Sequence, residues 1–176
     1  MTKLSGLAEQ LGKYDGMPSS LPPVDQWNPE LSGEIDIVIK ADGTWFHEGD
    51  EIKRAKLVRL FSTILKREGD DYYLVTPVEK WKISVEDLPF VAVLMEQTEN
   101  GLFMATNVGD EVQIGEDHSI LLDEQSSDEP NIPYVPVRAG LNARINRNVF
   151  YDLADQAHEK DGAFYVKIGG SEYCIG

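Results

Sequence analysis

The sequence has few cysteines and lacks long apolar runs, a secretory signal and the common nucleotide-binding motifs. It holds one cysteine, Cys174, in 176 residues, so it cannot form an internal disulfide, and we expect a reducing, cytoplasmic location. No apolar run reaches the roughly 18 residues that a membrane span requires, and residues 1–10 lack the apolar core of a secretory signal. It contains neither a G-x-G-x-x-G fingerprint nor a Walker motif. We therefore expect a soluble protein with no membrane partner.

Basic residues are also scarce. Lys and Arg number 16 against 31 Asp and Glu, which gives a formal net charge of −15. Such a charge repels the phosphates of nucleic acids and anionic membrane surfaces, so we expect no nucleic-acid partner. The composition, 41% hydrophobic and 27% charged, is that of an ordinary globular protein, and the length suits one or two small domains.

The chain divides into an arm and two folded parts. Residues 1–33 include Met17–Pro23, whose three prolines favour extended backbone, so we expect an N-terminal arm. We place an N-terminal α+β domain at 34–86 and a C-terminal β-rich domain with one helix at 87–176. The predicted fold class is α+β, mostly antiparallel, with one helix in each part.

The N-terminal part is predicted to contain one helix among strands. Asp42-Gly43 favours a hairpin turn, because glycine accepts the positive φ that the turn needs. Apolar residues recur with helical spacing from Leu57 to Leu65, and we expect this helix to end at Gly69 as a left-handed cap. Strands are expected at 35–40, 44–47, 72–76 and 81–85.

The C-terminal part repeats this mixture with more strands. Asn100-Gly101 and Gly169-Gly170 predict two further hairpins. Asn148 is expected to cap a second helix that stops at Gly162, and residues 123–131 are expected to form a solvated loop. Strands are expected at 90–97, 102–108, 111–114, 119–122, 134–138, 164–168 and 171–175.

The two parts show an internal repeat. At an offset of 92 residues, the apolar positions 57, 58 and 61 match 149, 150 and 153, and 72–74 match 164–166. At an offset of 98, residues 37–41 match 135–139. The alternative is that any two strand–helix–strand units align this well. A true duplication would create an interface between the halves, and such interfaces are frequent ligand sites.

All six arginines lie in two segments, residues 51–68 and 134–147, which are corresponding parts of the repeat. A guanidinium offers a planar fork of donors that suits phosphate or carboxylate. If the segments face each other they form an anion pocket, to which we assign Arg54, Arg138 and Arg144. Arg54 falls near the apolar stripe of the first helix, so we expect it to point towards packed structure. The alternative is that the arginines lie on solvated faces, paired with the surplus acids.

Trp45 and His47 belong to the strand whose counterpart carries Arg144. An aromatic ring beside basic groups can stack on a nucleobase, so we expect Trp45 to stack on the ligand and His47 to supply a hydrogen bond. Lys80 is expected to be a peripheral cation of the same site. The alternative for such aromatic side chains is a place in the core.

No catalytic or metal-binding constellation is visible in the sequence. His47 with Glu48 and Asp50 lacks regular ligand spacing and a partner histidine, so a polar loop is the favoured interpretation. Cys174 lies in a terminal apolar strand and is expected to be a core thiol. We therefore expect no enzyme, no metal and no resident cofactor.

Six strings of the sequence together resemble one bacterial family, that of domain of unknown function 1285. They are Asp42–Gly49, Leu57–Leu65, Tyr73–Lys80, Val85–Phe90, Thr106–Val108 and Val149–Leu153. The resemblance covers about residues 25–176. It implies a duplicated α+β core, a ligand site for a nucleotide-like molecule at the domain interface, and a role in signal transduction.

The resemblance also implies that the C-terminal half is superficially like a pleckstrin-homology fold. Two strands follow the helix expected at 148–160, whereas pleckstrin-homology domains end in their helix. That likeness therefore carries no function to this chain.

Three functional hypotheses follow. The first is a non-catalytic sensor that binds a small phosphorylated or nucleotide-like anion between its halves and acts through a signalling partner. The second is a protein-interaction module whose acidic stretch 83–137 meets a basic partner, with no small-molecule ligand. The third, an enzyme acting on a phosphorylated small molecule, is the weakest, because no nucleophile or metal spacing is present.

Overall fold

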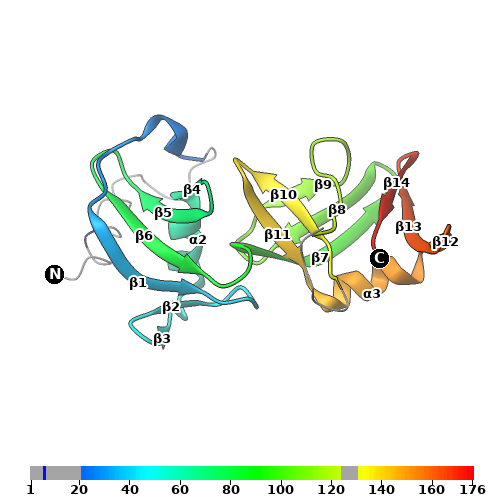
Figure 1. Ribbon diagram of the computed structural model, residues 1–176, viewed down its shortest axis with the longest axis horizontal. Coiled ribbons are helices and arrows are strands. Elements are labelled where there is room, and N and C mark those ends of the chain that lie inside the picture. Colours follow the sequence, from blue (N-terminus) through cyan, green and yellow to red (C-terminus); the bar gives the residue numbers. More distant parts are fainter. Residues whose placement is uncertain (1–5, 7–20, 124–130) are drawn as a thin grey trace. The chain divides into compact units, whose positions relative to one another are not determined.

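The computed structural model describes residue 6 and the ranges 21–123 and 131–176. Most of the expected arm 1–33 and of the expected loop 123–131 lies outside the described residues. The fold consists of two compact units, divided between Glu86 and Asp87. We call them the N-terminal unit and the C-terminal unit and describe each by itself (Figure 1).

Over residues 21–86, the N-terminal unit is built on one sheet of six strands with one α-helix. Its elements are η1 (Val24–Gln26), β1 (Gly33–Ile39), β2 (Trp45–His47), β3 (Asp50–Glu51), α2 (Ala55–Thr63), β4 (Leu65–Glu68), β5 (Asp71–Val75) and β6 (Lys80–Val85). The strand order is β3-β2-β1-β6-β5-β4. Neighbours pair antiparallel except β1 and β6, which are parallel. The predicted hairpin around Asp42-Gly43 is confirmed by the β1–β2 pairing.

The first helix is shorter than predicted. It ends at Thr63, and Leu65–Glu68 forms strand β4, which pairs with β5. Gly69, with φ of 62°, lies in the turn between those strands and is not the helix cap. Near the helix end, the hydroxyl of Thr63 donates to the carbonyl oxygen of Leu60 at 2.6 Å, a side-chain bond that competes with continued helix. Leu65 is fully buried as a strand residue. An apolar side chain at this position therefore fits both the helical spacing seen in the sequence and a buried strand.

In its described parts, residues 87–123 and 131–176, the C-terminal unit has two sheets and one helix. Its elements are β7 (Phe90–Thr98), β8 (Gly101–Thr106), β9 (Glu111–Gln113), β10 (Tyr134–Arg138), β11 (Leu141–Ile145), α3 (Arg147–Asp155), β12 (His158–Lys160), β13 (Ala163–Ile168) and β14 (Ser171–Cys174). The five-stranded sheet has the order β10-β11-β7-β8-β9, and the three-stranded sheet has the order β12-β13-β14. Both predicted hairpins are confirmed. The strand expected at 119–122 is reduced to one bridge between Leu121 and Tyr134.

Both ends of the second helix differ from the prediction. The N-cap is Asn146, whose side chain accepts a hydrogen bond from the Val149 amide at 2.9 Å, and not Asn148, which lies inside the first turn. The helix ends at Asp155, well before Gly162. His158–Lys160 instead pairs with β13. Ladder formation with a neighbouring strand therefore overrides a local signal for helix, as it does in the N-terminal unit.

The repeat predicted from the sequence is present in the structure. Helix α2 spans 55–63 and α3 spans 147–155, an offset of 92 residues at both ends. In each unit an antiparallel strand pair precedes the helix and three antiparallel strands follow it. The units differ in how these strands join. In the N-terminal unit β1 pairs with β6, so the strands before and after the helix form one sheet. In the C-terminal unit β11 pairs instead with β7 of the additional strands β7–β9, and β12–β14 form a separate sheet.

Each unit has its own apolar core. In the N-terminal unit the largest fully buried side chains are those of Ile37, Ile39, Trp45, Phe61, Ile64, Leu65 and Leu74. In the C-terminal unit they are those of Phe90, Met104, Leu141 and Ile145. Alternating burial along β1, β10 and β11 shows that these strands turn one face to the core.

Candidate functional site

Arg144, on β11, is held by partners within its own unit. Its Nε and Nη2 atoms donate to the two carboxylate oxygens of Asp87 at 2.9 and 2.8 Å, and Nη1 donates to the Ile132 carbonyl oxygen at 2.7 Å. The hydrogen bonds to Asp87 raise the pKa of Arg144, while partial burial opposes that shift. This bidentate geometry is the one that a guanidinium offers to an anion. Asp87 already occupies the place of that anion.

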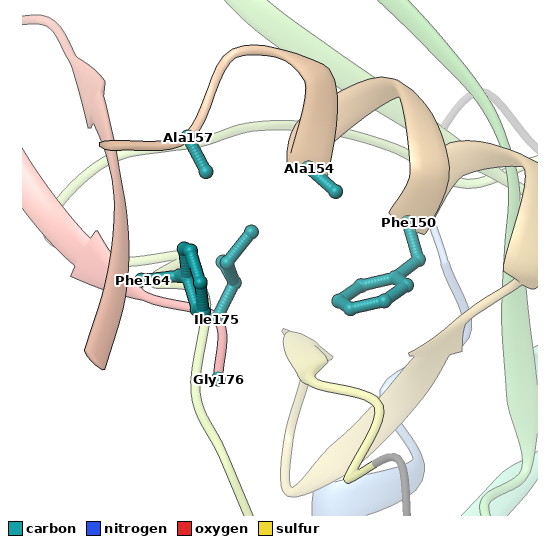
Figure 2. A pocket seen from close by; sticks show the side chains of 6 residues that line it. All are labelled: Phe150, Ala154, Ala157, Phe164, Ile175 and Gly176. Carbon is teal, nitrogen blue, oxygen red and sulfur yellow. The ribbon is translucent and has the colours of Figure 1, made fainter. Parts of the chain in front are cut away.

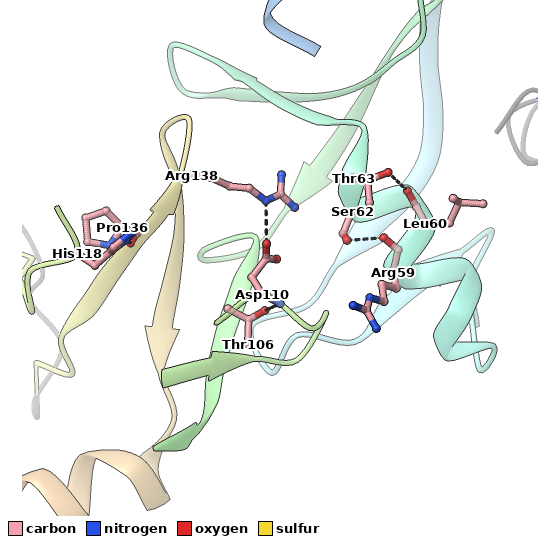
Figure 3. A network of polar contacts seen from close by, with 9 residues as sticks. All are labelled: Arg59, Leu60, Ser62, Thr63, Thr106, Asp110, His118, Pro136 and Arg138. Carbon is pink, nitrogen blue, oxygen red and sulfur yellow. Dashed lines mark hydrogen bonds and ion pairs between the residues drawn. The ribbon is translucent and has the colours of Figure 1, made fainter. Parts of the chain in front are cut away.

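Arg138, on β10, also has its charge neutralised by an acid of its own unit. Its Nε atom donates to Asp110 Oδ1 at 3.1 Å, and its guanidinium carbon lies 5.1 Å from the centre of the Phe90 ring. Figure 3 shows Asp110 between Arg138 and Thr106, whose hydroxyl accepts a hydrogen bond from the Asp110 amide at 3.1 Å. The Arg138 side chain is 16% exposed. An incoming anion would therefore compete with Asp110 for this group.

Lys80, on β6, shares its charge with one acid and one ring. It donates to Glu68 and lies 4.4 Å from the centre of the Tyr73 ring. The hydrogen bond from Lys80 lowers the pKa of Glu68. The backbone amide of Lys80 donates to the Ser32 hydroxyl at 3.0 Å, and β6 lies between β1 and β5 in the sheet, so this cation is held within the N-terminal unit.

Trp45 and His47, both on β2, have different environments. The Trp45 side chain is 1% exposed, and its Nε1 atom has no hydrogen-bond partner among the described residues. A ring buried to this extent offers no face on which a ligand could stack. His47 is half-buried, and its Nε2 atom lies 4.0 Å from a Glu48 carboxylate oxygen.

Arg54 is exposed and does not point into packed structure. It is the N-cap of α2, with extended backbone at φ of −78° and ψ of 100°. The prediction that Arg54 points inward assumed helical backbone at this position. The N-cap residue does not have helical dihedrals, so its side chain does not continue the apolar stripe. The carbonyl oxygen of Arg54 accepts hydrogen bonds from the amides of Leu57 and Val58.

The sequence marks residues 51–68 as a basic stretch, but of its first four cations only Arg54 was assigned to the site. Lys53, Arg54, Lys56 and Arg59 are all exposed, and none of their four side chains forms an ion pair or hydrogen bond with another described residue. We call these four the basic segment. By contrast, pairing with a carboxylate of the described residues is seen for Lys40, Lys66, Lys80, Lys82, Arg138, Arg144 and Lys160. Counting charges locates the basic segment, but only the structure separates paired from unpaired groups.

Other candidate groups add no chemistry to these. Cys174 is half-buried, and its Sγ atom lies 3.8 Å from the Gly176 carbonyl oxygen. Within residues 21–123 and 131–176, no group of three His, Cys, Asp or Glu side chains is arranged to hold a metal ion. None of the helices described is both long and apolar enough to cross a bilayer.

Four acidic side chains make the stability of the protein depend on pH. Hydrogen bonds lower the pKa values of Asp42, Glu68, Glu86 and Glu172, from Thr44, Lys80, the Ala41 amide and Lys160 respectively. A lowered folded-state pKa means that the unfolded chain binds protons first. The four carboxylates therefore contribute fully to the free energy of unfolding when the pH is above their ordinary pKa values, 3.8 for Asp and 4.5 for Glu. This contribution is lost as the pH falls through their lower pKa values in the folded protein.

We therefore expect urea midpoints to be insensitive to these groups between pH 6 and 8 and to fall below about pH 4.5. The Glu68→Gln variant removes one of the four groups, so its midpoint should fall less steeply between about pH 5 and 3 than that of the parent. Equal slopes for the two proteins would show that the Lys80–Glu68 contact does not contribute to the pH dependence.

The structure is that of a two-unit α+β protein with a repeated strand–helix–strand motif. Arg138, Arg144 and Lys80 pair with acids of their own unit, whereas the side chains of the basic segment have no partner among the described residues. A family model for domain of unknown function DUF1285 matches in two parts, the N-terminal domain at residues 22–88 and the C-terminal domain at 89–175. The chain belongs to the DUF1285 family, as its resemblance predicted. No curated protein matches it.

Two solved structures are similar to this chain. A DUF1285 family protein from Silicibacter pomeroyi DSS-3 is 43% identical, with a TM-score of 0.85, over 97% of this chain and 94% of that one. A DUF1285 family protein from Shewanella baltica OS155 is 28% identical, with a TM-score of 0.55, over 68% of this chain and 90% of that one. Both are bacterial members of the same family.

Proposed function

We propose that the protein binds a small anionic ligand, phosphorylated or nucleotide-like, through the basic segment of its N-terminal unit, and that it serves in signal transduction by responding to that ligand. One observation carries the proposal. In a chain with 31 acids and 16 bases, four neighbouring cations have no carboxylate partner among the described residues. Cations surrounded by excess acid are expected to be paired, so this cluster is the place where a ligand anion can supply the missing charge.

Local structure supports the same assignment. Lys56 and Arg59 are three residues apart in α2, which places them on neighbouring positions of one helix face. The first turn of α2 contains no acidic residue, so the positive end of the helix dipole adds to the charge of the segment. The amide of Ile52 donates to the Trp45 carbonyl oxygen at 2.8 Å, which ties the start of the segment to the strand that carries His47.

Among the residues assigned from the sequence, Arg54 therefore has the environment best suited to a ligand. Arg138, Arg144 and Lys80 are neutralised by acids of their own unit. The net charge of −15 also limits the ligand to a small molecule, because a long polyanion would meet repulsion beyond the segment.

The test is an NMR titration of the full chain with pyrophosphate and with ADP, following backbone amides. We expect shifts centred on residues 53–59 and an affinity that falls with added salt, because exposed charges are screened. The Arg54→Glu/Arg59→Glu variant should bind about tenfold to a hundredfold more weakly, from the loss and reversal of charge-assisted contacts. The Arg147→Glu/Lys167→Glu variant is the matched control, since it changes the net charge by the same amount. Both cations are exposed and their side chains also have no partner among the described residues, but each stands alone.

Equal weakening by the control variant would show that binding follows net charge and not the basic segment, and would contradict the proposal. Absence of shifts at 53–59 with both probes would contradict it as well. In that case, shifts in the acidic stretch 83–137 on addition of a lysine-rich peptide would favour a protein-interaction module.

A further inference from the structure

The C-terminal unit contains an apolar hollow that is independent of the basic segment. Its volume is about 220 Å³, and it lies between α3 and the β13–β14 hairpin. It is lined by Phe150, Ala154, Ala157, Phe164, Ile175 and Gly176. Figure 2 shows the two alanines and Phe150 on one side of the space and Phe164 and Ile175 on the other. No lining side chain carries a charge or a hydrogen-bonding group.

The internal repeat allows the hollow to be compared with the equivalent position of the N-terminal unit, where the residues are packed. Tyr72 pairs with Ile83 in the N-terminal unit. Their counterparts at an offset of 92 are Phe164 and Ile175, and the Ile175 amide donates to the Phe164 carbonyl oxygen at 2.9 Å. The two hairpins therefore share one register, and the positions that line the hollow can be compared one by one.

The comparison identifies what opens the hollow. Leu65 pairs with Leu74, and the pairing of His158 with Tyr165 sets the same register for Ala157. Leu65 is 0% exposed, whereas Ala157 lines the hollow. Likewise Tyr72 is 9% exposed, whereas its counterpart Phe164 is 50% exposed. The second copy thus has a smaller side chain and an uncovered ring where the first copy is packed.

The size and chemistry of the hollow define a class of ligand. An engineered cavity of about 150 Å³ with similar apolar lining stays dry and binds benzene, so a hollow of about 220 Å³ has room for one substituted ring or a short alkyl chain. Ala154 lies in the last turn of α3, and Ala157 follows two residues after the helix ends at Asp155; the helix dipole is negative at this end. Asp155 lies between the two alanines in the chain, and Glu159 follows them. A carboxylate at the mouth would therefore be repelled.

We propose that this hollow is a second binding site, which takes one ring or a short alkyl chain of a small molecule that is uncharged or bears an amine. The ligand inserts its apolar end against Phe150, Phe164 and Ile175, and its polar end faces solvent. This site differs from the basic segment both in its unit and in the charge that it selects.

The experiment uses the full chain with methyl-labelled Ala and Ile and three probes that share one ring: toluene, benzylamine and benzoate. We expect saturable shifts of the Ala154, Ala157 and Ile175 methyl groups with toluene and benzylamine, with a dissociation constant on the order of 1 mM for so small a ligand. Benzoate should bind several-fold more weakly at these methyl groups. Shifts that it produces at residues 53–59 belong to the basic segment and leave this proposal unaffected.

Two variants fill the hollow. Ala157→Leu restores the residue of the first copy, and Ala154→Leu fills it from the helix, so one remains usable if the other does not fold. Each should weaken toluene binding at least tenfold, whereas Ala55→Leu, the same substitution at an exposed position of α2, should leave it unchanged.

Three results would overturn the proposal: toluene shifts that do not saturate, undiminished binding by both filled variants, or benzoate binding as well as toluene. A fourth would be a parent that is dimeric by sedimentation and binds no probe while Ala157→Leu is monomeric. That outcome would assign the hollow to contact with a second copy of the chain.

Discussion

Replacing Trp45 with alanine is expected to lower the free energy of unfolding of the N-terminal unit by about 3–5 kcal/mol, the usual range for truncating a buried tryptophan. The side chain is 1% exposed and lies on β2, opposite Ile39 of β1. Its removal leaves a cavity between elements that are fixed by the six-stranded sheet, so the surroundings cannot collapse fully into the space.

All three tryptophans, Trp27, Trp45 and Trp81, lie in the N-terminal unit. Fluorescence during urea unfolding therefore reports on that unit alone, and Trp27 and Trp81 remain as reporters in the variant. Phe46→Ala is the matched control, because Phe46 is the next residue of the same strand, points to the other face and is only half-buried. A loss below about 1 kcal/mol for Trp45→Ala, or an equal loss for both variants, would contradict the core assignment.

A second substitution at Trp45 distinguishes a role in the core from a contact with the ligand. Trp45→Phe keeps a ring and removes an Nε1–H group that has no partner among the described residues, so it should cost less than Trp45→Ala. If the basic segment alone binds the anion, ADP affinity should be the same in Trp45→Phe and the parent. This is a stricter test of stacking than an alanine variant, whose unit is weakened.

The sequence predicts the elements well where one pattern acts alone. Alternation along β1 and the glycine turns at residues 43, 101 and 169–170 fix strands and hairpins by local rules. The predicted ends of the two helices were wrong, and for the first helix the reason is physical. Leu65 fits an apolar stripe and a buried strand equally well, and pairing with Leu74 across the β4–β5 hairpin decides between them.

The candidate site was less predictable, because it depends on which charges meet. Arg144 and Asp87 are 57 residues apart in the chain, and no local pattern links them. The sequence located the arginines and their place in the repeat, but the partners of Arg138, Arg144 and Lys80 are set by strand order and register. Arg54 is exposed at the N-cap of α2, one residue before the helix from which its inward direction was predicted.

Replacing Arg144 with alanine is expected to lower the free energy of unfolding of the C-terminal unit by about 2 kcal/mol, since it removes two charge-assisted bonds and leaves Asp87 and the Ile132 carbonyl oxygen without this donor. The side chains of Arg144 and Asp87 are 19% and 32% exposed, so solvent screening keeps the loss below that of a fully buried pair. Arg144→Lys should recover less than half, because an ammonium cannot form the bidentate pair.

The measurement is amide hydrogen exchange of β7 and β11 together with urea unfolding followed by far-UV circular dichroism. A double-mutant cycle with Asp87→Ala should give a coupling of about 1 kcal/mol or more, and Arg147→Ala, at an exposed cation on α3, should change stability by less than about 0.5 kcal/mol. No coupling would mean that the pair is not energetically linked.

The prediction for Arg144 also decides how binding data must be interpreted. If Arg144→Ala loses a ligand and stability together, the loss does not identify Arg144 as a contact, because unfolding alone reduces the fraction of binding-competent protein. A ligand that truly used this guanidinium would have to displace Asp87. It would therefore bind more tightly to Asp87→Ala than to the parent, whereas a ligand of the basic segment would bind both proteins equally.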